Sequence, residues 1–431
     1  MAEGRIPFDG PLYGLSQLGL IIGTIPGLPK PISYILLLPI LWISYHLITR
    51  TSTGDLSADV ALGSAILTQL LIGLDAMFFT NPDTLTNYQE PRLKGEKITE
   101  QSLKERLQFA FNLYTNPRGI GWAHEHRHLP SRPSPSTPRS KFVLIRLSTA
   151  LLCALLEFIA YTANASNPGT TTPGRGLRDA AIQWRALGVL AFATAGAARI
   201  CALNCLVSAG VVGLGFSSPE RWPRLFGSAL DAWSVQRFWR RVWHQLLRKS
   251  LISATTSLLS AFSVSPLSRA SSLPAKFAFL YTAFFIIGVV HIGGEYMLLG
   301  RWEWNGAFAF FQLQAVGITI EKIVAWVWSQ TPGHGRKEKD DRTHIGPDVN
   351  GNAQSNGKND KGTPNGAALK EKATDVDAVL PALWVRFIGY IWVASWFVWS
   401  LAFMIDPMTT TGMFADPRVD LRRKLTGWAS N

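Results

Sequence analysis

The chain has 431 residues, of which 47% are hydrophobic and only 16% are charged. This balance excludes an ordinary soluble protein of the same length. The formal net charge of +13 suggests nucleic acid as a partner, but the basic residues lie in loops between apolar runs, as on the cytosolic face of a membrane protein. The composition therefore predicts an all-α, polytopic integral membrane protein whose partner is the lipid bilayer and not a nucleic acid.

Apolar runs of the length needed to cross a bilayer recur along the chain. We expect roughly eight or nine transmembrane helices, at residues 12–25, 32–48, 60–79, 142–162, 187–215, 277–299, 307–328 and 380–405, with a weaker run at 251–264. Pro26 and Pro29 end the first run and no signal-peptide pattern precedes it, so we expect this helix to be retained.

Changes in composition divide the chain into five regions. They are N-terminal transmembrane helices at 1–80, a basic cytosolic loop at 81–141, a transmembrane core with the motifs described below at 142–330, a polar disordered loop at 331–378, and a C-terminal transmembrane helix and tail at 379–431. The excess of Lys and Arg in 81–141 and just before residue 251 places both segments in the cytosol. The sequon Asn164-Ala165-Ser166 lies between them, in a loop that is then lumenal.

Residues 231–249, the basic segment, show helical periodicity. One face of such a helix carries the basic side chains, namely Arg237, Arg240, Arg241, His244 and Arg248. The opposite face is apolar and includes Trp239 and Trp243. The pattern predicts a helix at the membrane-water interface. Its guanidinium groups are suited to phosphate, because their planar donors bind oxyanions in pairs.

His291 is the best candidate for chemistry inside the membrane, because burying an ionisable group there is costly. Glu295 follows four residues later on the same helix face and could fix the tautomer of the imidazole. Gly288 and Gly294 leave that face uncrowded, which would let a substrate approach. The alternative is a histidine bonded to a neighbouring helix, with glycines that serve helix packing.

Metal binding is the weaker interpretation of the other histidines and of the cysteines. His124, His126 and His128 alternate and could bind a metal in an extended segment, but a Ser/Pro-rich stretch follows directly. The three cysteines lie in apolar stretches without metal-ligand spacing: Cys153, Cys201 and Cys205. We expect no metal site, no disulfide framework and no tightly bound cofactor.

An imidazole inside the membrane and a separate arginine cluster suggest a reaction between a membrane-soluble molecule and a phosphate-bearing one such as coenzyme A. Residues 219–248 include R-W-P-R-L-F and F-W-R-R-V-W-H and resemble the signature of the wax-synthase-like branch of the membrane-bound O-acyltransferases. N-P-R-G-I-G-W at 116–122 is similar to a stretch of fungal members, and 310–321 is similar to their following helix.

The resemblance implies acyl-CoA-dependent transfer to a hydroxyl group. We expect the protein in the endoplasmic reticulum, with the basic segment on the cytosolic face as its positive charge indicates. The resemblance also implies that His291 is the catalytic base and that His244 supports the acyl thioester, while Trp239 has a supporting role. Acyl-CoA is expected to bind at Arg237, Arg240, Arg241, Trp243 and Arg248. Ile-Gly-Gly-Glu follows His291 where some members have a His-Glu pair, so an orienting role of Glu295 rests on its spacing alone.

Fungal relatives of this kind acetylate terpenoids and meroterpenoids, so we favour acetyl-CoA as co-substrate and a lipophilic secondary metabolite as the alcohol acceptor. Wax ester synthesis from long-chain alcohols is the alternative. A transporter is a different class, but no internal repeat is visible. An integral-membrane terpene cyclase would use acidic residues that face a cavity, and four are available: Asp75, Glu157, Glu295 and Glu321.

Overall fold

The computed structural model describes residues 4–85, 97–125, 129–172, 174–264, 272–330 and 382–414. The regular secondary structure of these residues is helical except for a short parallel pair of strands, β1 (Ile6–Pro7) with β2 (Thr51–Ser52). The polar loop expected at 331–378 and most of the C-terminal tail lie outside the described residues. The all-α prediction is confirmed for the described residues.

Seven of the described helices are long and apolar enough to cross a membrane. Six of these spans are α2 (Lys30–Arg50), α5 (Arg139–Ala165), α7 (Ile182–Gly213), α10 (Leu273–Leu299), α11 (Ala307–Gln330) and α12 (Leu383–Thr410). The seventh, Leu56–Phe79, combines α3 (Leu56–Leu74) with the π-helical turn η1 (Asp75–Phe79).

The expected count of eight or nine spans is not confirmed. Two of the expected runs form shorter helices, α1 (Gly10–Gly23) and α9 (Arg248–Ala261), of 14 residues each. At about 1.5 Å per residue each extends about 21 Å, which is less than the roughly 30 Å hydrocarbon core.

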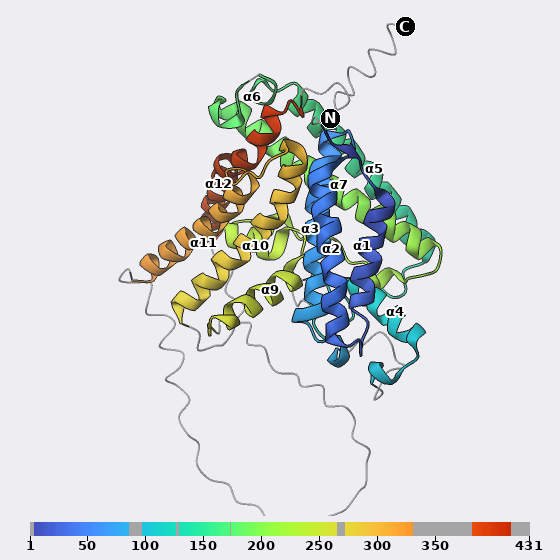
Figure 1. Ribbon diagram of the computed structural model, residues 1–431. Helices are drawn as coiled ribbons and strands as arrows, with labels where there is room; N and C mark the ends of the chain where they lie inside the picture. Colours follow the sequence, from blue (N-terminus) through green and yellow to red (C-terminus); the bar gives the residue numbers. More distant parts are fainter. Residues whose placement is uncertain are drawn as a thin grey trace, which may run out of the picture.

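The long helices run back and forth between two ends of the molecule (Figure 1). Helix α5 packs along α7, while α10 packs against both α3 and α11. The short helices α4 (Leu103–Tyr114) and α9 lie toward one end, and α6 (Pro168–Thr171) lies at the other (Figure 1). This arrangement agrees with the expected separation of the basic loops from the connection between α5 and α7.

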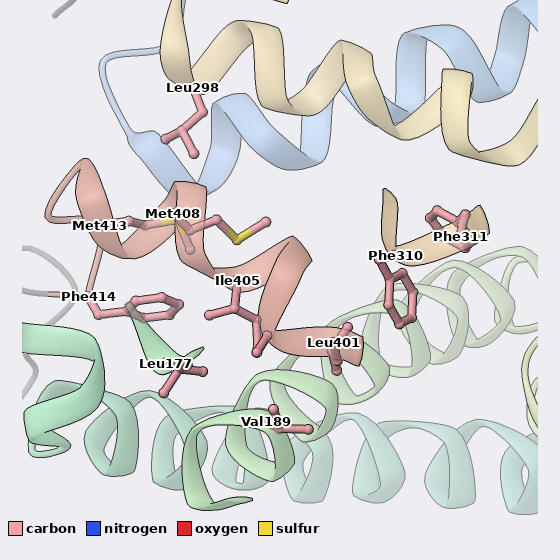
Figure 2. Close-up of a cluster of buried hydrophobic side chains, with 11 residues drawn as sticks. Leu177, Val189, Leu298, Phe310, Phe311, Leu401, Ile405, Met408, Met413 and Phe414 are labelled. Carbon is pink, nitrogen blue, oxygen red and sulfur yellow. The ribbon is translucent and has the colours of Figure 1, made fainter. Parts of the chain in front are cut away.

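A buried apolar cluster joins α7, α10, α11 and α12 (Figure 2). It includes Phe310, Phe311, Leu401, Ile405 and Met408. The outer faces of the long helices are apolar as well: Leu151 in α5 is 74% exposed and Leu190 in α7 is 66% exposed. Large aliphatic side chains exposed on long helices are what a lipid environment requires.

The sequon lies in the last turn of α5 and not in an open loop. The Asn164 side chain is only 1% exposed, so its amide is covered by the folded protein. An oligosaccharide attached there would have to displace this packing. The sequon therefore gives no support to the orientation of the chain, which rests on the distribution of basic residues.

The prediction of one continuous helix over residues 231–249 is wrong. The segment contains the short turns η7 (Ala229–Asp231) and α8 (Val235–Arg237), the π-helical turn η8 (Phe238–Val242), and then Trp243 with ψ of 150°, before α9 begins at Arg248. Tertiary contacts cause the breaks. Glu321 of α11 accepts hydrogen bonds from the backbone N–H groups of Val235 (2.5 Å) and Gln236 (3.1 Å), which starts the helical turn there.

Candidate functional site

The turn η8 places Trp239 at the centre of an aromatic cluster between three membrane-spanning helices. Its ring centroid lies 5.9 Å from Phe284 of α10, 5.8 Å from Phe311 of α11 and 6.3 Å from Phe397 of α12. Its Nε1–H donates to Gln314 Oε1 at 3.4 Å. These contacts fix the indole from several directions, so the basic segment is anchored inside the helix bundle and not only at its surface.

The His291 imidazole lies beside this aromatic cluster. It stacks on Phe311, with ring centroids 4.7 Å apart and planes 21° apart, and the same Phe311 ring contacts Trp239. The side chain of His291 is half-buried. The structure therefore connects the basic segment to the intramembrane histidine through one shared phenyl ring.

The glycines near His291 serve helix packing, as the alternative interpretation held. A Cβ atom at Gly294 would lie 2.4 Å from the Val60 carbonyl oxygen of α3, and one at Gly288 would lie 2.9 Å from the Phe308 ring. The opposite glycine, Gly63, would bring a Cβ within 2.3 Å of the Gly293 carbonyl oxygen. Close backbone contact with α3 thus holds α10, and His291 with it, in place.

His244 follows the extended residue Trp243 and packs against aromatic rings. Its ring centroid lies 5.1 Å from Trp243 and 5.9 Å from Phe226. Burial, followed by the neighbouring His291 and Arg118, lowers the pKa of His244 to about 4, so the imidazole is neutral near pH 7. Its Nδ1 is buried and has no hydrogen-bond partner among the described residues.

Glu295 is 1% exposed and contacts the start of the next helix. Its Oε1 accepts a hydrogen bond from the Ala307 N–H at 2.5 Å, which caps α11. A Cβ at Gly306 would lie 1.9 Å from this oxygen, so only glycine fits beside the cap. Within the described part of the chain no hydrogen bond joins Glu295 to His291, and its orienting role stays a prediction.

The arginines predicted to share one face of the basic segment lie in several different environments. Arg237 pairs with Asp231 and lies 4.3 Å from the Trp233 ring centroid. Arg248 donates to the Arg240 carbonyl at 3.0 Å and to Gln245 Oε1 at 3.1 Å. Burial, followed by Arg240, lowers the pKa of Arg248 to about 10. The side chain of Arg240 itself is exposed.

Arg241 lines an open cleft of about 490 Å³ together with Arg224, Phe226 and Asp231. Sequence reasoning missed Arg224, although it stands inside the R-W-P-R-L-F stretch. Two guanidinium groups in one cleft are suited to phosphate oxygens. Since Phe226 also contacts His244, the cleft adjoins the histidine.

The other acidic candidates have structural partners. Asp75 pairs with Lys249 at 2.8 Å, Glu157 pairs with Arg199 at 2.6 Å, and Glu321 binds the start of α8 as described. Groups engaged in this way do not present the proton donors that a terpene cyclase requires. In the described part of the chain no cluster of three His, Cys, Asp or Glu residues could hold a metal ion, and His126 and His128 lie outside it.

Comparison with known proteins agrees with the family resemblance that the motifs indicate. Residues 222–313 match the model of the Membrane bound O-acyl transferase family, a range that contains both His244 and His291. The chain is 32% identical over 331 residues to acetyltransferase ple2 of Rhodocybe pseudopiperita, an alignment that covers 74% of this chain and 82% of that protein.

Two further relatives align over most of their length. Acetyltransferase eriL of Hericium erinaceus is 28% identical over 412 residues, which cover 94% of this chain and 92% of that protein. O-Mevalon transferase macI of Penicillium terrestre is 26% identical over 343 residues, which cover 76% of this chain and 68% of that protein.

Proposed function

We propose, since this chain belongs to the membrane bound O-acyl transferase family, that it moves an acetyl group from acetyl-CoA to a hydroxyl group of a lipophilic secondary metabolite, a terpenoid or meroterpenoid. The relatives named acetyltransferases support acetyl as the group transferred. The observation that carries the proposal is a series of aromatic contacts between the two histidines, next to a cleft that contains two arginines. His244 contacts Trp243, which contacts Trp239, and Phe311 joins Trp239 to His291.

In the proposed reaction the imidazole of His291 accepts the proton of the acceptor hydroxyl. The hydroxyl oxygen then forms a bond to the thioester carbonyl carbon, and the carbonyl oxygen gains negative charge. When the carbon-sulfur bond breaks, the sulfur leaves as a thiolate that takes the proton from His291. The products are the acetyl ester and coenzyme A, and His291 returns to its neutral form.

His244 is suited to stabilise the charge on the carbonyl oxygen. A neutral imidazole carries one N–H, and the low pKa of His244 keeps the ring neutral near pH 7. A donor held in a buried aromatic environment needs little rearrangement when charge develops on the oxygen. The contacts with Trp243 and Phe226 hold the ring in place for this role.

The phosphates of acetyl-CoA are proposed to bind at Arg224 and Arg241, in the cleft of about 490 Å³. Arg237 is already neutralised by Asp231, and this makes it less suited to the same task. In this proposal the protein lies in the membrane of the endoplasmic reticulum. The end of the molecule with α4 and α9 faces the cytosol, because the basic loops lie there.

Comparative mass spectrometry of extracts tests the proposed function. Deleting the gene should remove one metabolite and leave its precursor with one acetyl group fewer. That precursor and labelled acetyl-CoA should then give the metabolite with purified protein in lipid nanodiscs. Long-chain esters of fatty alcohols as the only product would establish wax ester synthesis instead. No acyl transfer from any acyl-CoA would overturn the proposal.

A kinetic comparison tests the cleft. Arg224→Ala and Arg241→Ala should each raise the KM for acetyl-CoA about tenfold, as the loss of one charged hydrogen bond predicts, with little effect on the KM for the alcohol. Arg175→Ala is a matched control, because Arg175 is exposed and follows α6 closely in the sequence. Helix α6 lies at the other end of the molecule (Figure 1). An unchanged KM for acetyl-CoA in both cleft variants would exclude a phosphate role.

A further inference from the structure

The N-P-R-G-I-G-W stretch at residues 116–122 forms a tight loop whose purpose is not explained by the reaction above. Asn116 closes it, because its Nδ2 donates to the Ile120 carbonyl at 2.8 Å and its Oδ1 accepts from the Ile120 N–H at 3.0 Å. Gly119 and Gly121 have φ of +63° and +83°, a conformation that other residues adopt only with strain. The loop is therefore built to hold its remaining members in one conformation.

The residue held inward by this loop is Arg118, which is 6% exposed. Its Nη2 donates to the Arg224 carbonyl at 3.0 Å, and its Nη1 donates to the Pro223 carbonyl at 3.5 Å. Arg146 of α5, itself 8% exposed, donates to the carbonyl of Trp222. Two buried guanidinium groups thus bind three consecutive carbonyl oxygens.

The bound carbonyls belong to the Trp-Pro segment, residues 222–227, which leads directly to the proposed site. Phe226 contacts the His244 ring, and the Gly227 N–H donates to the Val242 carbonyl at 2.9 Å. Two residues separate the last bound carbonyl, that of Arg224, from the Gly227 hydrogen bond. A shift of the Trp-Pro segment must therefore move the backbone and the ring that hold His244.

We propose that Arg118 is a positioning residue of the acyl transfer, which fixes the Trp-Pro segment and through it the His244 imidazole. The placement of His244 follows from the contacts alone, whereas its effect on turnover rests on the function proposed above. Burying a charged guanidinium is costly, and Arg118 is buried although its Nε has no hydrogen-bond partner among the described residues. A purely structural brace does not need such a charge. The charge of Arg118 also contributes to the low pKa of His244, consistent with their proximity.

Arg118→Met tests this proposal, because it keeps an unbranched side chain of similar length and removes both hydrogen bonds and the charge. In folded protein we expect kcat to fall about 100-fold with little change in the KM for acetyl-CoA, since a misplacement of about 1 Å can have this effect. Arg118→Lys keeps the charge but cannot bind two carbonyls as a planar fork, so its kcat should fall about tenfold. A kcat within about twofold of wild type for both variants would overturn the proposal.

Arg106→Met is the matched control. Arg106 of α4 is also a partly buried arginine that donates to a backbone carbonyl, that of Pro26 at 2.7 Å. It thus binds the connection between α1 and α2 and not the Trp-Pro segment. Loss of this bond should lower the melting temperature and leave kcat and KM of the folded enzyme unchanged. If the role of Arg118 were purely structural, Arg118→Met would also have a lower melting temperature with unchanged kcat and KM.

A second measurement does not depend on turnover. Diethyl pyrocarbonate modifies accessible imidazoles, and mass spectrometry locates the modified histidines. In Arg118→Met the modification of His244 should accelerate about tenfold or more, as expected when a charged hydrogen bond that holds the segment is lost. Modification of His46, which stacks on Trp42 of α2, should not change. An unchanged rate at His244 overturns the positioning role, whereas accelerated modification without acetyl transfer by the wild type overturns only the proposed function.

Discussion

Replacing Gly227 by alanine tests how closely the Trp-Pro segment must approach η8. A Cβ atom at this position would lie 2.0 Å from the Arg241 carbonyl oxygen, a backbone atom that cannot rotate away. The Gly227 N–H also donates to the Val242 carbonyl at 2.9 Å. The substitution thus forces apart two segments that a hydrogen bond holds together.

The expected displacement follows from these distances. Carbon and oxygen atoms that are not bonded rarely approach closer than about 3.0 Å, so the segments must separate by about 1 Å. Such a shift stretches the hydrogen bond to Val242 to about 3.9 Å, beyond the accepted range. Trp243 and His244 come directly after Val242 in the sequence and should move with it. A displacement of about 1 Å at a reacting site lowers kcat about 100-fold.

The assay is steady-state acetyl transfer by purified Gly227→Ala protein in nanodiscs, with the fraction of folded protein determined by size-exclusion chromatography. Gly196→Ala is the matched control, because a Cβ at Gly196 of α7 meets open space and alanine favours a helix. We expect wild-type kinetics for the control. Wild-type kcat in Gly227→Ala would refute the claim that the Trp-Pro segment and η8 must be in close contact.

Three further predictions concern stability and modification. Asp75→Asn should lower the free energy of unfolding by about 3–5 kcal/mol, because it removes the buried carboxylate, only 2% exposed, that pairs with the Lys249 ammonium group. Thermal unfolding measures this loss, and an unchanged melting temperature would contradict it. Burial, followed by Lys249, lowers the pKa of His124 from 6.5 to about 4, so the unfolded chain binds the proton first and stability should fall as the pH drops from about 6.5 to about 4. His124→Gln should make this decline shallower, and an equal slope in wild type and variant would exclude the effect. Endoglycosidase treatment should not change the electrophoretic mobility of the protein, because Asn164 is covered; a mobility shift that Asn164→Gln abolishes would show that the site opens.

The membrane helices could be predicted from the sequence because long apolar runs leave few alternatives. Each of the seven spans lies on an expected run, and only the two short helices α1 and α9 made the predicted count too high. Burial of Asn164 depends on how α5 meets its neighbours. A three-residue sequon contains no information about that packing.

Motifs indicated the candidate site residues, but the arrangement of these residues could not be predicted from the sequence. Helical periodicity over residues 231–249 assumes that local preference decides the backbone. Here Glu321, about 85 residues away, starts a turn at Val235, and the hydrogen bond from Gly227 holds the carbonyl of Val242 where the turn ends. These long-range contacts divide the basic side chains between a salt bridge, a cleft and the surface. Arg224 and Arg118 were overlooked for the same reason, since their importance depends on contacts distant in sequence.

In the proposed reaction, His291 accepts the proton of the acceptor hydroxyl. The most direct measurement is kcat for acetyl transfer by folded His291→Ala protein, with labelled acetyl-CoA and the identified alcohol. We expect kcat to fall about 10²–10⁴-fold, the usual contribution of a general base, with an almost unchanged KM for acetyl-CoA. Turnover near the wild-type rate by correctly inserted His291→Ala protein would contradict it.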